Sequence, residues 1–391
     1  MPEFIVLKNA HRISTTGPFE EFGPGMAAAV APAPDVQVHE VSAEAARLIA
    51  QDRQVAAVAI PMPISLISPL KADLPAGVEA ATDAWGLAAV KAITSPFTGD
   101  GVVVAVLDTG IDKNHKAFAG MEILEKDFSG SGNGDRHGHG THCAGTIFGR
   151  DVDGKRIGIA RGVKKALIGK VLNDTGGGNS DMIFRGIQWA LEQGAHVISL
   201  SLGFDFPGAV ERMTQGGMPI PPATSKALES YRSNLRFFDA LIQMVEAKGA
   251  FGQTAVVVAA AGNESDRPNY TIAASLPAAS KGVISVAALG RNGAGGFDVA
   301  RFSNTMSQIA APGVDVLSAK VGGGLASMSG TSMACPHVAG VAALWWESLI
   351  KSGAGASAAL VGAKLAATAH TDGLSSPPLD RGAGIVTAPQ Q

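Results

Sequence analysis

Four side chains of the types used in acyl transfer stand next to apolar or glycine-rich segments. Asp108 directly follows one short apolar run, and Asn263 follows another after a single glycine. His139 and Ser332 stand where glycine-rich segments run into helical stretches of small residues. A serine hydroxyl attacks a carbonyl only when a base removes its proton, and an amide donor can stabilise the resulting oxyanion. Each residue alone is also explained by a turn, a cap or core packing, so it is the set that indicates covalent catalysis.

The apolar runs predict the strands of a parallel sheet. They lie at 102–107, 166–172, 197–202, 255–260 and 283–288, and they alternate with helical stretches at 139–148, 180–193, 225–248 and 331–349. Short, uniformly apolar strands between helices are typical of a doubly wound α/β sheet that is covered on both faces. Sites in such sheets form at the carboxyl ends of the strands. We therefore expect the four residues to meet at one edge.

A smaller unit precedes this sheet. The pattern predicts strands at 4–7, 36–41 and 55–59, a helix at 43–54 capped by Ser42, and a loop up to Pro34. Prolines at 61, 63, 69 and 75 predict a linker, so we divide the chain into an α+β module at 1–76 and a larger domain at 77–391. The segment 205–249 is a long insertion, and Pro219, Pro221 and Pro222 predict that part of it is irregular.

Composition excludes several classes of function. Hydrophobic residues make up 46% of the 391 residues and charged ones 17%, which suits a large buried core. The net charge of −3 indicates neither nucleic acid nor an anionic membrane as partner. No apolar run can span a bilayer, and Glu20 and Glu21 stand where a secretory signal needs basic residues. We expect a cytoplasmic protein or one exported by another route.

Five motifs give this pattern a family resemblance. They are DTGID (108–112), HGTHCAGT (139–146), SLSLG (199–203), AAAGNE (259–264) and GTSMACPHVAG (330–340). Together they resemble the subtilisin (subtilase) family of serine peptidases, over about residues 85 to 388. The resemblance implies a three-layer sandwich, a serine endopeptidase activity and protein or peptide substrates.

The resemblance also assigns roles. Ser332 is the nucleophile, His139 the general base, Asp108 the residue that orients it, and Asn263 an oxyanion donor. Substrate peptides in this family add as a strand between two segments, which match Gly176, Gly177 and Gly178 on one side and Ser201, Leu202 and Gly203 on the other. Ser275 resembles a wall of the pocket for the residue before the cut, and Glu264 stands near its rim.

The N-terminal module resembles the family's propeptide, which assists folding and inhibits the site. This implies a zymogen whose partner is its own N-terminal segment, with autocleavage somewhere between Pro61 and Ala76. The insertion at 205–249 follows a substrate-binding strand, so it is either part of the cleft rim or a decoration without catalytic consequence.

Calcium is where this sequence departs from the family. Members that bind it carry an acidic ligand at the position of Ala117, so no cofactor is required here on this interpretation, although Asp151 and Asp153 could hold a cation differently. Cys143 and Cys335 are predicted to pack as small apolar residues, with one optional bridge left open.

Three alternatives remain at the level of sequence. His137, His139 and His142 have a spacing found in metal sites, which favours a metallohydrolase but leaves the serine motif unexplained. A peptide-binding scaffold without activity conflicts with four competent catalytic residue types. A peptide ligase or cyclase would use the same acyl-enzyme.

Overall fold

A computed structural model describes residues 1–9, 34–70, 82–247 and 254–391. The predicted loop before Pro34 lies mostly outside these residues. So does the boundary that we place between residues 76 and 77.

A mostly parallel sheet forms the centre of the described chain. Eight strands make it, in the order β13-β12-β11-β9-β5-β7-β6, with β14 also paired to β12; only the pairing of β12 with β13 is antiparallel. Their bounds are β5 Val103–Asp108, β6 Glu122–Asp127, β7 Lys165–Lys170, β9 Val197–Leu200, β11 Val256–Ala260, β12 Val283–Arg291, β13 Phe297–Val299 and β14 Ile309–Pro312. The predicted α/β class is confirmed. Strands β6, β13 and β14 were not predicted: β6 (EILEKD) and β13 (FDV) carry no strong apolar run, and β14 (IAAP) is apolar but only four residues long.

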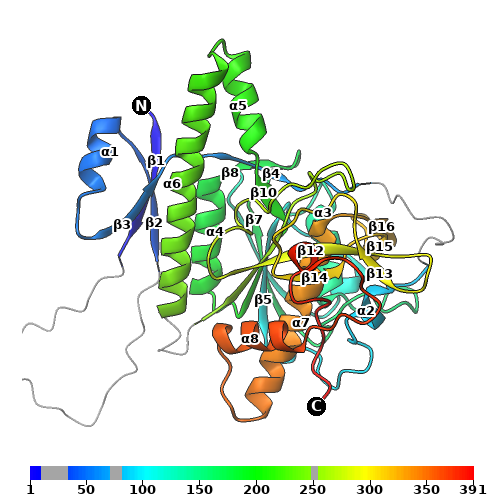
Figure 1. The fold of residues 1–391 in the computed structure, drawn as a ribbon. Coiled ribbons are helices and arrows are strands. Elements are labelled where there is room, and N and C mark those ends of the chain that lie inside the picture. Colours follow the sequence, from blue (N-terminus) through cyan, green and yellow to red (C-terminus); the bar gives the residue numbers. More distant parts are fainter. Residues whose placement is uncertain (10–33, 71–81, 248–253) are drawn as a thin grey trace, which may run out of the picture.

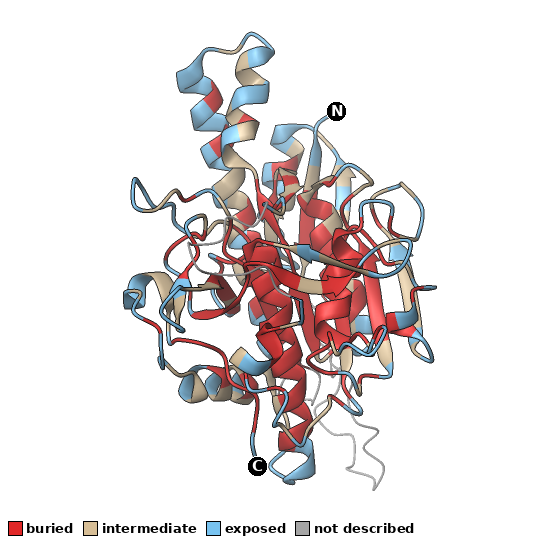
Figure 2. Ribbon diagram, turned by 90° about the vertical axis from the view of Figure 1, so that its right-hand side faces the viewer, coloured by how far each residue is buried: buried red, intermediate tan, exposed pale blue. Residues whose placement is uncertain are grey.

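Helices cover both faces of this sheet. Along β5, Val104 and Val106 enter one hydrophobic core, while Ala105 and Leu107 enter another, because successive side chains of a strand point to opposite faces. The first core contains α3 (His139–Phe148), α7 (Thr331–Lys351) and α8 (Ala358–Thr368); the second contains α4 (Ser180–Glu192) and α6 (Ile220–Ala247). Buried residues gather in the sheet and in the helices against it (Figure 2).

The N-terminal segment forms a second, smaller sheet. Strands β1 (Glu3–Lys8), β2 (Asp35–Glu40) and β3 (Val55–Ala59) pair antiparallel in the order β2-β1-β3, and α1 (Ala43–Ile49) begins at the predicted cap, Ser42. In Figure 1 this sheet lies beyond α4 and α6, on the side away from the central sheet. Its inward residues, Ile5 and Leu7, belong to the same hydrophobic core as Phe184 and Phe237 of those helices.

The chain that follows β3 does not form the predicted linker. Asn234 donates its amide to the Ile60 carbonyl (2.7 Å), and Ser180 and Met62 exchange two hydrogen bonds. Residues Pro63–Leu66 then form β4, which pairs antiparallel with both β8 (Gly177–Asn179) and β10 (Leu202–Phe204). The linker prediction is wrong for residues 63–66. Prolines suggested a linker there, but a proline is tolerated at the first position of a strand, where Pro63 stands.

The long insertion forms a helical hairpin. Helix α5 (Phe206–Gln215) leads into α6; α5 and the adjoining N-terminal part of α6 project from the body of the molecule, while the rest of α6 packs in the core (Figure 1). The predicted irregularity is present at residues 216–219, which include Pro219 and join the two helices. Pro221 and Pro222 instead lie in the first turn of α6, where backbone N–H groups have no acceptor within the helix. The remaining short elements are α2 Gly86–Ala89, a 3₁₀ turn Lys116–Phe118, β15 Val316–Ala319, β16 Leu325–Met328 and α9 Pro378–Arg381.

Candidate active site

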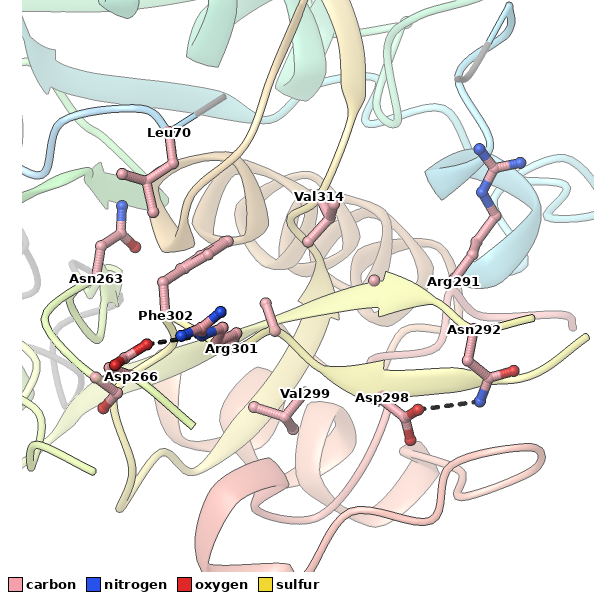
Figure 3. Close-up of a pocket in the computed structure, with 13 residues that line it drawn as sticks. Leu70, Asn263, Asp266, Arg291, Asn292, Asp298, Val299, Arg301, Phe302 and Val314 are labelled. Carbon is pink, nitrogen blue, oxygen red and sulfur yellow. Dashed lines mark hydrogen bonds and ion pairs between the residues drawn. The ribbon is translucent and has the colours of Figure 1, made fainter. Parts of the chain in front are cut away.

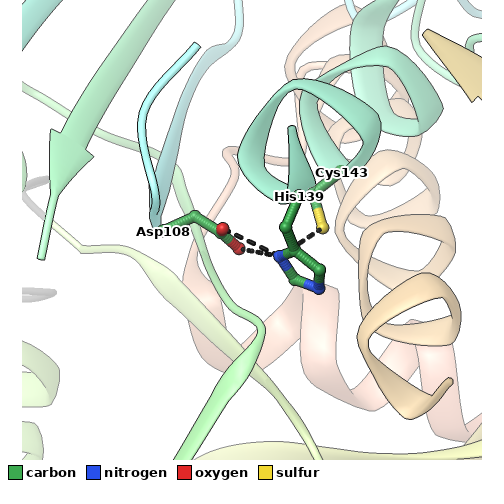
Figure 4. A group of neighbouring side chains, drawn as sticks. All are labelled: Asp108, His139 and Cys143. Atoms are coloured by element: carbon green, nitrogen blue, oxygen red, sulfur yellow. Dashed lines mark hydrogen bonds and ion pairs between the residues drawn. The ribbon is translucent and has the colours of Figure 1, made fainter. Parts of the chain in front are cut away.

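Asp108 and His139 form a buried pair at the carboxyl edge of the sheet. Asp108 ends β5, and His139 opens α3. The Nδ1 atom of His139 lies 2.8 and 3.0 Å from the two carboxylate oxygens of Asp108, and neither side chain is exposed (Figure 4). Gly140 permits this approach, because a Cβ there would lie 2.2 Å from the carbonyl oxygen of Gly110. The arrangement leaves Nε2 as the ring nitrogen that can exchange a proton.

A second buried carboxylate, Asp135, fixes the loop around this pair. It accepts hydrogen bonds from the hydroxyl of Thr109 (3.0 Å), the backbone N–H of Gly138 (2.8 Å) and both donors of Thr141 (2.9 and 2.6 Å). Burial acts to raise the pKa of this carboxyl, but these donors outweigh it and hold the pKa below its ordinary value. Asp135 thus ties the strand that carries Asp108 to the helix that carries His139. Sequence reasoning missed it, because an aspartate in a glycine-rich loop gives no distinctive signal.

Ser332 is the second residue of α7, at the end where N–H groups are free of acceptors within the helix. Pro336, four residues on, has no N–H to offer the Ser332 carbonyl. That carbonyl instead accepts the hydroxyl of Ser201 (3.1 Å) and the thiol of Cys143 (3.4 Å). Burial raises the pKa of Cys143 well above its usual value, which suits a thiol that donates. Hydrogen bonds from Cys143 of α3 and from Ser201, the residue before β10, therefore fix α7 at Ser332.

Asn263 faces the same point from the end of β11. Its Oδ1 atom accepts both the backbone N–H and the hydroxyl of Thr331, each at 2.9 Å. The amide orientation is thereby set, and Nδ2 turns toward the cleft. Gly330 leaves room for it, since a Cβ there would come within 3.0 Å of Nδ2. The structure thus places a fixed amide donor beside the first turn of α7.

Strand β4 occupies the cleft between the two predicted substrate segments. Its Leu66 N–H donates to the Gly176 carbonyl (2.8 Å), Ile64 pairs with Gly178, and Ser65 pairs with both Gly177 and Gly203. On the β10 side, Leu66 also pairs with Leu202. The chain's own N-terminal segment therefore lies where the resemblance puts a substrate strand.

The peptide segment Ile67–Ser68 lies against two of the candidate catalytic residues, Ser332 and Asn263. The hydroxyl of Ser332 donates to the Ile67 carbonyl (3.1 Å) and lies 3.3 Å from the Ser201 carbonyl. Asn263 Nδ2 donates to the carbonyl of the next residue, Ser68 (3.1 Å). Among the described residues, Nε2 of His139 has no hydrogen-bond partner. The hydroxyl of Ser332 is thus bonded to the strand that covers it and not to Nε2 of His139.

Two cavities flank the covered cleft. One of about 900 Å³ lies beside Ile67 and is lined in part by the predicted pocket residues Glu264 and Ser275. The other, of about 540 Å³, lies where the chain leaves the site (Figure 3). Leu70 and Asn263 stand at one end of it, and Arg291 stands at the other. The two cavities therefore lie on either side of the Ile67–Ser68 bond along the covering strand.

The three histidines of the predicted alternative metal site do not converge. His142 uses Nε2 for the carbonyls of Val316 (3.0 Å) and Ala326 (3.1 Å), and burial lowers its pKa to about 3. The ring centroids of His137 and His139 are 6.3 Å apart. His142 is thus a structural histidine, and the geometry gives the metallohydrolase alternative no support.

The region of Ala117 is held by hydrogen bonds from Arg150. The backbone N–H of Arg150 donates to the Ala117 carbonyl (2.7 Å). The guanidinium of Arg150 donates to the carbonyls of Phe148 (3.1 Å), Val163 (2.8 Å) and Arg161. Three backbone carbonyls near the end of α3 are thus bonded to the guanidinium of Arg150.

The guanidinium of Arg156 also bonds carbonyls of the loop that follows α3. Arg156 donates to the carbonyls of Ala92, Gly158 and Ile159, each at 3.2 Å. Asp151 and Asp153 are exposed and pair separately, with Arg161 (3.5 Å) and with Lys116 (3.4 Å), so they do not share a cation.

Comparison with known proteins places this geometry in a family. The sequence model of the subtilase family matches residues 99–384. An intracellular serine protease of Paenibacillus polymyxa is 35% identical over 282 residues, which are 70% of this chain and 72% of that protein. Proteinase R of Parengyodontium album is 35% identical over 272 residues (66% and 59%), and subtilisin-like protease 6 of Trichophyton verrucosum is 34% identical over 272 residues (66% and 57%). The match spans less than two thirds of the latter two proteins.

The chain belongs to the subtilase family, and it is a subtilisin-like serine endopeptidase. In the described residues, no helix has both the length and the apolar character needed to cross a membrane.

Proposed function

We propose that the protein hydrolyses peptide bonds through an acyl-enzyme on Ser332. The observation that carries this is that Ser332 and Asn263 bond two successive carbonyls of a bound strand, those of Ile67 and Ser68, while the Asp108–His139 pair lies at the same edge of the sheet. Substrate would pair with β8 and β10 in the place of β4, so backbone hydrogen bonds would hold many different sequences. Besides the side-chain amide of Asn263, the backbone N–H of Ser332 in the first turn of α7 can donate a hydrogen bond at the site.

The proposed steps use these residues in turn. His139 Nε2 takes the hydroxyl proton of Ser332 as Oγ attacks the substrate carbonyl carbon, and the negative charge moves to the carbonyl oxygen. Asn263 Nδ2 and the N–H of Ser332 stabilise that oxygen, while Asp108 holds the protonated imidazole in place. His139 then gives the proton to the leaving amine. Water repeats the sequence on the ester and frees the second product.

We further propose that the chain is made as a zymogen. The support is the N-terminal module, which shares a core with α4 and α6 and sends β4 through the cleft. In this state the Ser332 hydroxyl is bonded to the Ile67 carbonyl, and Asn263 to the Ser68 carbonyl, so the oxyanion donor is one residue out of step with the nucleophile. The strand is thus held as an inhibitor, and cleavage between Pro61 and Ala76 would release it.

We infer that calcium is not required for this activity. Arg150 and Arg156 together bond six carbonyl oxygens around the loop after α3, where they supply the positive charge that a bound cation would bring.

The experiment is expression of the full chain and of Ser332→Ala, with the intact mass of each and a fluorophosphonate label. Wild type should be trimmed between residues 61 and 76 and labelled at Ser332, while Ser332→Ala should stay full length and unlabelled. Product mass separates hydrolysis, which adds one water, from transfer to an amine. Trimming of Ser332→Ala in isolation would remove the self-processing proposal, and unlabelled wild type would remove the acyl-enzyme.

A further inference from the structure

The larger cavity beside the cleft has a wall that comes from the helical hairpin. On that side it is lined by Phe206 of α5 and by Leu228 and Tyr231 of α6. Across from them stand Tyr270 and Ile272, in the segment between β11 and β12. Phe206 and Tyr231 meet edge to face, with ring centroids 6.1 Å apart. The wall therefore belongs to the insertion and is not part of the central sheet.

The geometry of β4 shows which substrate residue would face this cavity. Side chains alternate along a strand, so residues 65 and 67 share one face and residues 64 and 66 the other. Ile64 packs beside Gly178 and is not among the residues that line the cavity. Ile67, the residue after β4, lies beside Gly203, and Ser65, Leu66 and Ile67 all border the cavity. Leu66 also shares a hydrophobic core with Ile64, whereas Ser65 does not.

Ile67 precedes the bond at the nucleophile, so Ser65 is the third residue before that bond. Its side chain is a single hydroxymethyl group, half buried, in a cavity of about 900 Å³. A much larger side chain at this position would find room between the hairpin and the opposite segment.

The walls of the cavity are apolar and partly exposed. Leu228 is 45% exposed, Tyr270 55% and Ile272 43%, and all three face the same space. Clustered exposed apolar side chains mark a binding site more often than scattered ones do. The acidic side chain at the rim, Glu264, is already bonded to the amide of Asn304 (2.6 Å), so it does not make the cavity a site for a basic residue.

We propose that the α5–α6 hairpin is a specificity element, with Phe206, Leu228 and Tyr231 selecting a large apolar or aromatic side chain at the third residue before the cut. The inference rests on the proposed function, because it requires substrate to bind in the place of β4. Serine in β4 at this position leaves the cavity unfilled, so the inhibitory strand binds less tightly than a preferred substrate and gives way to it.

The test compares two p-nitroanilide substrates, succinyl-Ile-Xaa-Leu-Ile-p-nitroanilide with Xaa either Ser or Phe. The anilide fixes the cut after the last isoleucine, so Xaa occupies the third position. The enzyme is the active form obtained from the full chain, and the ratio of kcat/KM for Phe over Ser is measured. Wild type should favour Phe by about tenfold or more, as expected for burial of an aromatic ring in an apolar pocket.

Leu228→Ser should bring that ratio down by at least threefold. The matched control is Ile220→Ser, which changes an exposed apolar residue (68%) at the start of α6 but outside the cavity, and should keep the wild-type ratio. Ile272→Ser tests the opposite wall and serves as the second variant if Leu228→Ser does not fold. A wild-type ratio near one, or equal ratios in wild type and both wall variants, overturns the inference. Release of no anilide from either substrate by labelled, trimmed wild type counts instead against the proposed function.

Discussion

The hydroxyl of Ser332 lies 3.1 Å from the carbonyl oxygen of Ile67. This hydroxyl thus donates a hydrogen bond to the strand that covers it, and Nε2 of His139, whose Nδ1 is bonded to Asp108, has no hydrogen-bond partner among the described residues. On the proposed mechanism, His139 Nε2 is the atom that would accept the Ser332 hydroxyl, and in this structure that hydroxyl is bonded to Ile67 instead. Substitutions at four positions test the covered site and the contacts around it: Ile64, Asn263, Arg150 and His142.

Weakening β4 should activate the uncleaved chain. Ile64 is buried to 2% exposure against Gly178, and an ionised side chain there would lose its hydration without a partner. Ile64→Asp should therefore raise the initial rate on a small anilide substrate at least tenfold before any cleavage of the chain. The rate is read in the first minutes, with intact mass taken in parallel. Val38→Asp, a substitution at an exposed position of the same module, is the control; an equal effect in both would mean general loosening of the module.

Asn263 should act on kcat and hardly on KM. Asn263→Asp keeps an oxygen toward Thr331 but replaces the amide donor by an acceptor, and Asn263→Leu removes both. In each variant kcat should fall by about 10²- to 10³-fold, a range established on subtilisin itself. Steady-state kinetics on a peptide substrate checks this, with thermal unfolding as the structural control. A change confined to KM would contradict the role of Nδ2 at the oxyanion.

Arg150 should contribute to the free energy of unfolding through its three hydrogen bonds to backbone carbonyls. Arg150→Met removes a cation and leaves the carbonyls of Phe148, Arg161 and Val163 without that donor, at a cost of about 3 kcal/mol in unfolding free energy. Arg161→Met, in the same loop and 45% exposed, should cost under about 1 kcal/mol. Both are measured by urea unfolding in the Ser332→Ala background to prevent autolysis. Wild type should show the same midpoint with EDTA and with added calcium, and a clear drop in EDTA would refute calcium independence.

His142 should make the fold sensitive to acid. Burial lowers its pKa to about 3 from an ordinary value of 6.5, so between these pH values the unfolded chain binds a proton that the folded chain does not. Stability from this group is complete above pH 6.5 and is lost as the pH falls toward 3, by about 1.4 kcal/mol per pH unit. His337, with a pKa lowered by burial to about 4, acts in the same direction.

The substitution His142→Gln keeps donors for the Val316 and Ala326 carbonyls. Its unfolding free energy, again in the Ser332→Ala background, should fall less steeply than that of the parent between about pH 6.5 and about pH 4.5. Parallel curves would show that His142 is not the group that titrates.

Much of the central sheet could be predicted because its signals are local. Uniformly apolar strands and small-residue helices depend on neighbours in sequence, and α3 has the bounds that the sequence predicts. The carboxyl ends of parallel strands meet at one edge, so Asp108 and Asn263 could be expected near His139 and Ser332 from the sequence alone. Strand β6 was missed because its sequence, EILEKD, is polar and finds its place only by pairing with β7.

The sequence by itself determined the family and the α/β class, and it proposed the catalytic residues, because these inferences depend on local motifs and apolar runs. Only the tertiary structure decided that residues 63–66 form a strand in the cleft rather than a linker, since β4 gains its hydrogen bonds from segments more than a hundred residues away. The same holds for Asp135, which joins the end of β5 to the start of α3, and for Arg150, whose carbonyl acceptors share no sequence signal. Contacts between distant segments are set by packing, and these contacts place β4 between β8 and β10 with Ile67 against Ser332.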